Sequence, residues 1–512
     1  MRLEPRVPAE RIVARNSAPV APRRRTVLYW MTAHRRATWN FALERAVEWC
    51  RSLKRPLLVF EPLRIGYRWA SARHHQFVID GMRDHCASFA AAGVGYYPYV
   101  EPRAGAGAGL LAALARDACV VVTDDYPCFF LPRMLESASR RLDVLLEAVD
   151  SNGFVPMRAA AREFTAAVHF RRYVQKRLLE RMEVLPLATP LDELPKQVGC
   201  EVADDVQTRW PRAADRLLAG DPAALRALAI DQSVAPTIVE GGAVAAHALH
   251  DTFFQHRFAG YATERSDPSE QHASELSPHI HFGHVATHEI IARVFERERW
   301  RPEHLVRAQL GKREGFWGMS ADAEALLDQL IVWRELGFNA CAERSDHESL
   351  SALPRWAQTT LAEHAADPRP EQYELAAFER AETHDELWNA TQRQLVREGR
   401  IQNYLRMVWG KKILEWSATP ARALAIMIEL NNKYALDGRD PNSYNGILWV
   451  LGRFDRPWAP TRAVFGCVRY MSTANSQRKF RLKDYLARYA ASAPDPTRCD
   501  RLRTGLRATS ND

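Results

Sequence analysis

Hydrophobic residues recur along the first 160 positions in short runs that alternate with longer amphipathic stretches. Five runs rich in β-branched and aromatic residues are expected to be strands, at 26–31, 56–63, 94–100, 119–123 and 144–149. Helical periodicity lies between them, for example over 39–54 and 74–91. This βαβα order predicts a doubly wound parallel sheet with helices on both faces, over residues 26–160.

The pattern changes after residue 160. Residues 161–245 are helical and interrupted by prolines, and we expect them to connect two domains. Over 246–495, long periodic segments with interleaved aromatic residues and arginines predict an all-α domain. Residues 1–25 and 496–512 are expected to be a disordered leader and a disordered tail. The glycine-rich stretch at 103–109 lacks the GxGxxG spacing of a dinucleotide-binding loop, so we expect a flexible loop there.

Composition narrows the class of protein. The chain has 512 residues, 47% hydrophobic and 26% charged, which is ordinary for a globular protein of two domains. No run approaches the roughly eighteen apolar residues of a membrane span, and the N-terminus lacks the apolar core of a secretory signal. Eight scattered cysteines without a CxxC pair indicate reduced thiols in the cytoplasm and argue against zinc or iron–sulfur sites. The net charge of +8 permits a polyanionic partner without requiring one.

The densest chemistry lies between residues 383 and 471, in the segments THDELWNATQRQL, YLRMVWGKKILEW, LNNKYALDGRDPNSYNGILW and FGCVRYM. Trp409 and Trp416 are seven residues apart, so on a helix they share a face about 10.5 Å apart, a spacing typical of core packing. The polar turn that begins at Asp437 is typical of a surface loop. Because apolar helices flank it, the turn also suits the polar head group of a cofactor.

These segments, in this order and spacing, resemble the FAD-binding half of class II cyclobutane pyrimidine dimer photolyases in the photolyase/cryptochrome family. Upstream, YAxxR from Tyr261 and SELSPHIHFG from Ser274 resemble the segment that lines the FAD phosphates, and VLYWM at 27–31 resembles the start of the family's Rossmann-like antenna domain. The resemblance covers roughly residues 26–490. It implies a monomeric deoxyribodipyrimidine photo-lyase that binds FAD, uses light to split dimers in UV-damaged DNA, and has room for a second antenna chromophore of the deazaflavin or folate type.

The resemblance also assigns FAD contacts. Ser274, Leu276 and Ser277 would offer hydroxyl and backbone donors to the pyrophosphate near a helix start, where the helix dipole favours anions. Arg406 and Asp437 match an ion pair beside the flavin ring that would stabilise its reduced, anionic form. Asn431 matches the residue that faces flavin N5, with a helix C-terminal cap as the alternative. The full cofactor-binding set implied is Tyr261, Arg265, Ser274, Leu276, Ser277, Arg406, Asp437, Asp440 and Asn442.

Further residues match an electron path and a lesion pocket. The path from flavin to surface would be Trp409, Trp388 and Trp416, and these can pack in the core as well. Indole faces can stack on extruded bases, and the residues matched to contacts with a flipped-out dimer are Trp333, Met407 and Trp449. In a loop matched to the DNA side, an arginine suits phosphates and a wedge residue fills the gap left in the duplex; the two candidates are Trp458 and Arg469.

Gln329 is the main departure from the family, which has a glutamate there that hydrogen-bonds the dimer. Glutamine keeps the shape and two donors but cannot ionise. Each ~1.4 kcal/mol of lost transition-state stabilisation would lower turnover about tenfold. Gln329 and Gln402, which stands where histidine is usual, favour the alternative of a cryptochrome-like blue-light photoreceptor, whereas the retained Trp333 and Trp449 favour repair.

Smaller departures mark a divergent member of the class. Asn432 replaces an aspartate, Phe454 a histidine and His279 a tyrosine. His279 also belongs to a group of four histidines with His281, His284 and His288. A metal site would need a third ligand and supporting contacts, so we expect no metal and place these histidines on a helix surface or beside FAD.

Overall fold

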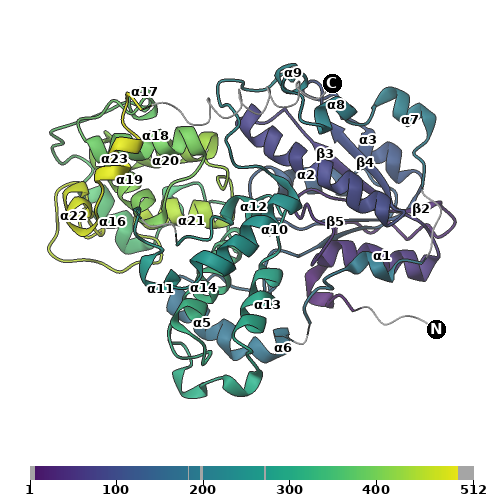
Figure 1. Ribbon diagram of the computed structural model, residues 1–512, viewed down its shortest axis with the longest axis horizontal. Helices are drawn as coiled ribbons and strands as arrows, with labels where there is room; N and C mark the ends of the chain where they lie inside the picture. The colour runs from purple at the N-terminus through teal and green to yellow at the C-terminus, as the bar shows by residue number, and fades with distance from the viewer. Residues whose placement is uncertain (1–5, 183, 196–199, 270–271, 494–512) are drawn as a thin grey trace.

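The structure is a computed structural model that describes residues 6–182, 184–195, 200–269 and 272–493 (Figure 1). The tail predicted to be disordered over 496–512 lies outside these residues. Figure 1 shows a sheet-containing domain on the right and a helical domain on the left, with α5, α6, α13 and α14 below the junction.

The sheet has six strands in the order β1(Ile12–Ala14), β6(Leu146–Val149), β5(Ala118–Asp124), β2(Thr26–Trp30), β3(Leu57–Leu63) and β4(Gly95–Val100). The five strands from β2 to β6 run parallel, and β1 pairs antiparallel with β6. All five predicted strands are confirmed. Chain order reverses between β2 and β5, so the carboxyl ends of these strands form the crevice where open α/β sheets bind ligands.

Both faces of the sheet are covered. α1(Phe41–Leu53) and α2(Ala72–Ala91) pack on one face, and α3(Leu110–Ala115) and α4(Leu131–Ser139) pack on the other. Successive side chains of β2 alternate between the two, because strand side chains point to opposite faces: Val27 and Tyr29 pack with α1, and Leu28 and Trp30 pack with α3 and α4. The predicted doubly wound fold is confirmed, with one antiparallel edge strand added.

The prediction of a disordered leader is wrong for residues 6–25. A 3₁₀ helix, η1(Ala9–Arg11), leads into β1. Val7 is buried, and the buried guanidinium of Arg11 donates to the backbone carbonyls of Asp150, Gly153 and Phe154. These bonds hold the segment against the loop after β6. The segment is therefore ordered although its sequence shows neither helical periodicity nor strand alternation. Residues 1–5 lie outside the described part of the chain.

The predicted connector divides between the two domains. Its first helices, α5(Ala167–Lys176) and α6(Leu178–Met182), pack in the core of the helical domain through Phe170 and Val174. Its later helices, α7(Asp204–Arg209), α8(Asp215–Leu218) and α9(Pro222–Arg226), pack against the sheet domain, where Val206 and Trp210 are buried. The segment therefore spans the junction with each end anchored.

The rest of the described chain forms the helical domain. Its elements are α10(Gly242–Thr252), η3(Phe253–Arg257), α11(Tyr261–Glu264), α12(Ser277–His281), α13(Thr287–Arg297), α14(Ala321–Leu327), η6(Asp328–Arg334), α15(Glu335–Glu343), α16(Arg355–Glu363), α17(Leu375–Glu379), α18(Glu386–Glu398), α19(Asn403–Trp416), α20(Pro420–Tyr434), α21(Pro441–Val450), α22(Thr473–Lys479) and α23(Lys483–Arg488), with three short 3₁₀ turns at Pro302–His304, Arg307–Gln309 and Leu350–Ala352. A further 3₁₀ turn, Pro190–Glu193, packs against α1 of the sheet domain. Among the described residues, no helix is long and apolar enough to cross a membrane.

Two glycines let helices approach α21 closely. A Cβ at Gly410 on α19 would lie 2.7 Å from Val450, and one at Gly337 on α15 would lie 2.9 Å from the backbone of Asn442. Both distances are shorter than carbon contacts allow, so only glycine permits this packing. The close approach brings α15, α19 and α21 around one cavity.

Candidate functional site

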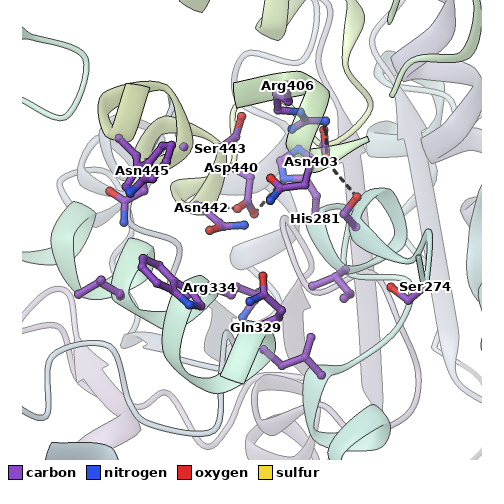
Figure 2. A pocket seen from close by; sticks show the side chains of 18 of the residues that line it. Ser274, His281, Gln329, Arg334, Asn403, Arg406, Asp440, Asn442, Ser443 and Asn445 are labelled. Atoms are coloured by element: carbon purple, nitrogen blue, oxygen red, sulfur yellow. Dashed lines mark hydrogen bonds and ion pairs between the residues drawn. The ribbon is translucent and has the colours of Figure 1, made fainter. Parts of the chain in front are cut away.

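A cavity of about 370 Å³ lies in the helical domain, within the usual size range of ligand pockets of ~300–1,000 Å³. The predicted site residues that line it are Tyr261, Ser274, Ser277, Gln329, Trp333, Arg406, Met407, Asp437, Asp440, Asn442 and Trp449. Segments almost 190 positions apart in the chain thus meet at one place. Figure 2 shows their side chains converging from several helices.

One end of the cavity is polar. Arg406 Nη2 lies 2.9 Å from Asp437 Oδ1, and the Ser277 hydroxyl donates to Asp437 Oδ2 at 2.9 Å. The predicted Arg406–Asp437 ion pair is therefore present. Ser274 lies at the same end (Figure 2). Hydroxyl groups of this kind suit phosphate oxygens, and a fixed ion pair suits a neighbouring ring that gains negative charge.

Asp440 joins the cavity to the sheet domain. Its Oδ1 accepts from the Asn442 amide at 2.8 Å and so caps α21, while its Oδ2 accepts from the hydroxyl of Tyr126, which follows β5, at 2.9 Å. Burial alone would raise the pKa of Asp440, but the hydrogen bond with His281 and the charge of Arg334 outweigh it and hold that pKa below its ordinary value. The carboxylate stays ionised and fixes the start of α21.

The element η6 is a π-helix, a form often found at functional sites. Its wider turn directs Gln329, Trp333 and Arg334 to the cavity together. The Trp333 indole N–H donates to Asp328 Oδ2 at 3.1 Å, and Asp328 is held in turn by Arg171 of α5 at 2.8 and 3.2 Å. The orientation of Trp333 thus depends on a buried ion pair that reaches into the predicted connector.

Two basic side chains lie near the indole of Trp449. Lys411 Nζ lies 5.5 Å and the Arg469 guanidinium 5.9 Å from its ring centre. The same guanidinium lies 4.8 Å from the ring of Trp458, whose indole N–H donates to Asp455. Trp458 and Arg469 do not line the cavity. They form a cation–π stack that continues from Trp449 into the loop after α21.

The three predicted electron-path tryptophans are in mutual contact. Trp388 lies between the other two: its ring is parallel to that of Trp409 at 6.5 Å, with 4° between the planes, and edge-on to Trp416 at 6.1 Å. All three are buried. Trp416 contacts the ring of His384, an exposed residue, at 4.8 Å, so the array reaches the surface through a neighbour.

Two residues of the predicted cofactor-binding set, and Asn431, which was matched to the residue facing flavin N5, do not line the cavity. The guanidinium of Arg265 lies over the ring of Tyr261, which does line it, at 5.4 Å. Leu276 is buried in the core at the start of α12. The Asn431 amide donates to the hydroxyl of Ser443, a lining residue, at 2.8 Å, so Asn431 stands behind the wall.

The departures from the family have structural partners. The side chain of Gln402 caps α19 by accepting from the amides of Tyr404 and Leu405, and donates to the carbonyl of Arg265. Asn432 Oδ1 accepts from the Arg439 amide at 3.0 Å. Phe454 gives the cavity an apolar wall.

The placement of the histidines on a helix surface is wrong for His279, His284 and His288, which are buried at the junction of the domains. His279 packs on Phe77 of α2 with ring centres 5.0 Å apart. Only His281 lies at the cavity. Over the described residues, no group of three or more His, Cys, Asp or Glu is arranged to hold a metal ion.

Several lining residues were not predicted, among them Arg334, Asn403, Ser443 and Asn445. Arg334 had a signal, since a charge within the apolar helix LIVWRELGF must find a partner, and it donates to the Asn152 carbonyl at 2.7 Å. Nothing in the spacing of Asn445 distinguished it from the rest of α21.

The fold, an α/β domain joined to a helical domain, is shared with a solved photolyase. The crystal structure of a bacterial class III photolyase from Agrobacterium tumefaciens matches with a TM-score of 0.63 at 16% identity, over 93% of this chain and 88% of that one. No protein-family model matches the chain.

Two sequence relatives share a higher identity with this chain than that solved structure does. A deoxyribodipyrimidine photo-lyase of Methanothermobacter thermautotrophicus is 33% identical over 94% of this chain and 98% of its own length. A second deoxyribodipyrimidine photo-lyase, from Oryza sativa subsp. japonica, is 32% identical over 90% of this chain and 87% of its own length. The chain belongs to the deoxyribodipyrimidine photo-lyase family, and the predicted family and enzyme class are confirmed.

Proposed function

We propose that this protein repairs cyclobutane pyrimidine dimers in UV-damaged DNA by light-driven electron donation from bound, reduced FAD, as a divergent member of class II. One observation carries the proposal: a single cavity joins the Arg406–Asp437 pair at one end to Trp333 and Trp449. An anionic cofactor and a flat, base-sized substrate would therefore be in contact.

The residues fit FAD. Ser274 and Ser277 offer hydroxyls suited to phosphates, the Arg406–Asp437 pair would lie beside the flavin ring, and Ile280, Leu326 and Leu330 offer an apolar wall for rings. Asp437 lies beside Arg406, so the pair is a fixed dipole that needs no rearrangement when charge develops next to it. When bound, reduced FAD supplies the electron that light excites.

The chain's own residues would position the dimer. Trp333 and Trp449 stack on the extruded bases, Met407 fills the space between them, and the Gln329 amide donates to a carbonyl of the dimer. The dimer accepts an electron, its cyclobutane ring splits, and the electron returns, so the reaction causes no net oxidation or reduction. Trp409, Trp388 and Trp416 would deliver electrons inward to keep the cofactor reduced.

A second cavity supports the proposal of an antenna chromophore. It encloses about 480 Å³ beside the carboxyl ends of β2, β3 and β4 and is lined by Trp30, Phe60, Tyr99 and Phe130, with Arg64, Arg133 and Arg141 also along it. An aromatic slot with several cations suits a planar, acidic pigment of the deazaflavin or folate type.

A cryptochrome-like photoreceptor is the second candidate, favoured by Gln329 in place of an ionisable group. Binding separates the two: a repair enzyme prefers dimer-bearing DNA over the same sequence undamaged, and a photoreceptor does not. We further propose that the protein is cytoplasmic, because the described cysteines are free thiols, and that it acts as a monomer, as the resemblance to the family implies.

The test is purification followed by an absorption spectrum and binding to matched oligonucleotides with and without one dimer. Flavin absorbance together with preference for the dimer supports the proposal. A colourless protein, or equal affinity for both oligonucleotides, refutes it.

A further inference from the structure

Asn445 is the buried polar group that the site leaves unexplained. Its side chain lies on α21 and is 6% exposed, and neither its Oδ1 nor its Nδ2 has a hydrogen-bond partner. The amides of Asn431 and Asn432, on the neighbouring α20, are both hydrogen-bonded. An unpaired buried amide destabilises a fold, so its presence at a cavity wall points to a ligand that completes it.

The position of Asn445 in the cavity indicates which ligand its side chain would contact. Asn445 precedes Trp449 by four residues, so the two side chains lie on the same face of α21. Figure 2 shows Asn445 at the end of the cavity opposite Ser274, with Gln329 on the helix that faces α21. The amide thus belongs to the tryptophan end, away from the donors suited to phosphates.

The chemistry of the group matches a nucleobase. A primary amide presents one donor and one acceptor side by side, and the edge of thymine presents an N–H beside a carbonyl. Oδ1 can accept from the ring N–H while Nδ2 donates to the adjacent carbonyl, the same two-point pairing by which amide side chains read bases elsewhere.

We propose that Asn445 is a specificity-determining residue that hydrogen-bonds the edge of the extruded pyrimidine dimer. The proposal rests on the function proposed above and deepens it. With Gln329 across the cavity, Asn445 gives this protein two neutral amides for the lesion. A neutral amide can also rotate by half a turn and exchange its donor and acceptor, so the pair would accept thymine and cytosine edges alike.

The first test is Asn445→Leu, which removes both polar atoms at nearly constant volume. Affinity for a dimer-bearing oligonucleotide should fall by roughly threefold to tenfold, while affinity for the undamaged oligonucleotide should not change. The melting temperature of the free protein should stay level or rise, since no hydrogen bond of the free protein is lost. If Asn445 had only a structural role, affinity for the dimer-bearing oligonucleotide should not change and the melting temperature should fall.

Asn339→Leu is the matched control. Asn339 is an equally buried amide on α15, but it accepts from the Phe164 amide at 3.1 Å and donates to the Arg162 carbonyl at 3.0 Å. This variant should lower the melting temperature and keep the full preference for dimers.

The outcomes separate the two proposals. If the unaltered protein prefers dimers and Asn445→Leu keeps that preference, the inference is refuted and the proposed function stands. If Asn445→Leu loses flavin absorbance, the amide serves the cofactor and the inference is equally refuted. If the unaltered protein shows no preference for dimers, the proposed function fails and the inference fails with it.

Discussion

Asp328 offers a sharp test of how the proposed lesion pocket is built. Its carboxylate is 4% exposed, binds Arg171 through two bonds and accepts from the indole N–H of Trp333. Asp328→Ala strands the Arg171 guanidinium, whose side chain is 9% exposed. Breaking a buried ion pair in this way costs about 3–5 kcal/mol of unfolding free energy.

The double variant Arg171→Met/Asp328→Leu separates stability from function. Replacing both members of a buried pair by apolar residues is often neutral, so most of the lost stability should return. The Trp333 N–H, however, remains without its acceptor, which costs about 1–3 kcal/mol and frees the ring to turn.

The assays are urea unfolding and binding of dimer-bearing DNA. We expect the free energy of unfolding of the double variant to lie within about 3 kcal/mol of that of the unaltered protein. Its affinity for dimers should be roughly tenfold lower, and photoreduction of its flavin should not change. Asp346→Asn, which weakens an Arg344–Asp346 pair away from the cavity, is the control. If the double variant regains full dimer affinity, Asp328 has no part in positioning Trp333.

The remaining predictions concern three other residues. Trp409→Phe should block photoreduction of the flavin but leave repair intact after chemical reduction, and normal photoreduction would show that the electron path is assigned wrongly. Gln329→Glu should raise repair yield by about tenfold, equivalent to ~1.4 kcal/mol, and no change in yield would mean that residue 329 does not face the lesion. Burial lowers the pKa of His279 to about 4, so the unfolded chain takes up a proton near pH 6.5 before the folded protein does. The contribution of His279 to the free energy of unfolding is therefore fully present above pH 6.5. It is lost as pH falls towards 4, and the loss is about 2 kcal/mol at pH 5. His279→Phe should flatten the fall in melting temperature between pH 7 and pH 5, and parallel curves would exclude His279 as its source.

The sheet could be predicted because strand and helix periodicities are local properties of the chain. β1 could not, since three residues are too few to show alternation and the strand is held by pairing with β6 and by the bonds of Arg11 to carbonyls some 140 positions away. The spacing of Trp409 and Trp416 likewise indicated a shared helix face. It could not show that Trp388, from another helix, lies between them.

The site was predicted mainly through its resemblance to a family, and that route favours residues the family shares. It placed the Arg406–Asp437 pair and the two tryptophans that we propose contact the lesion, Trp333 and Trp449, at the cavity. It missed the ion pair of Arg171 and Asp328 and the unpaired amide of Asn445, because both arise from packing between segments far apart in the chain.

Illumination of the purified protein with a dimer-bearing oligonucleotide tests the central claim most directly. With the flavin reduced, intact pyrimidines should appear in blue light and not in darkness, at a rate that follows the absorption of the flavin. A protein that contains reduced flavin and binds the oligonucleotide, yet leaves the dimers unchanged after prolonged illumination, would contradict the account.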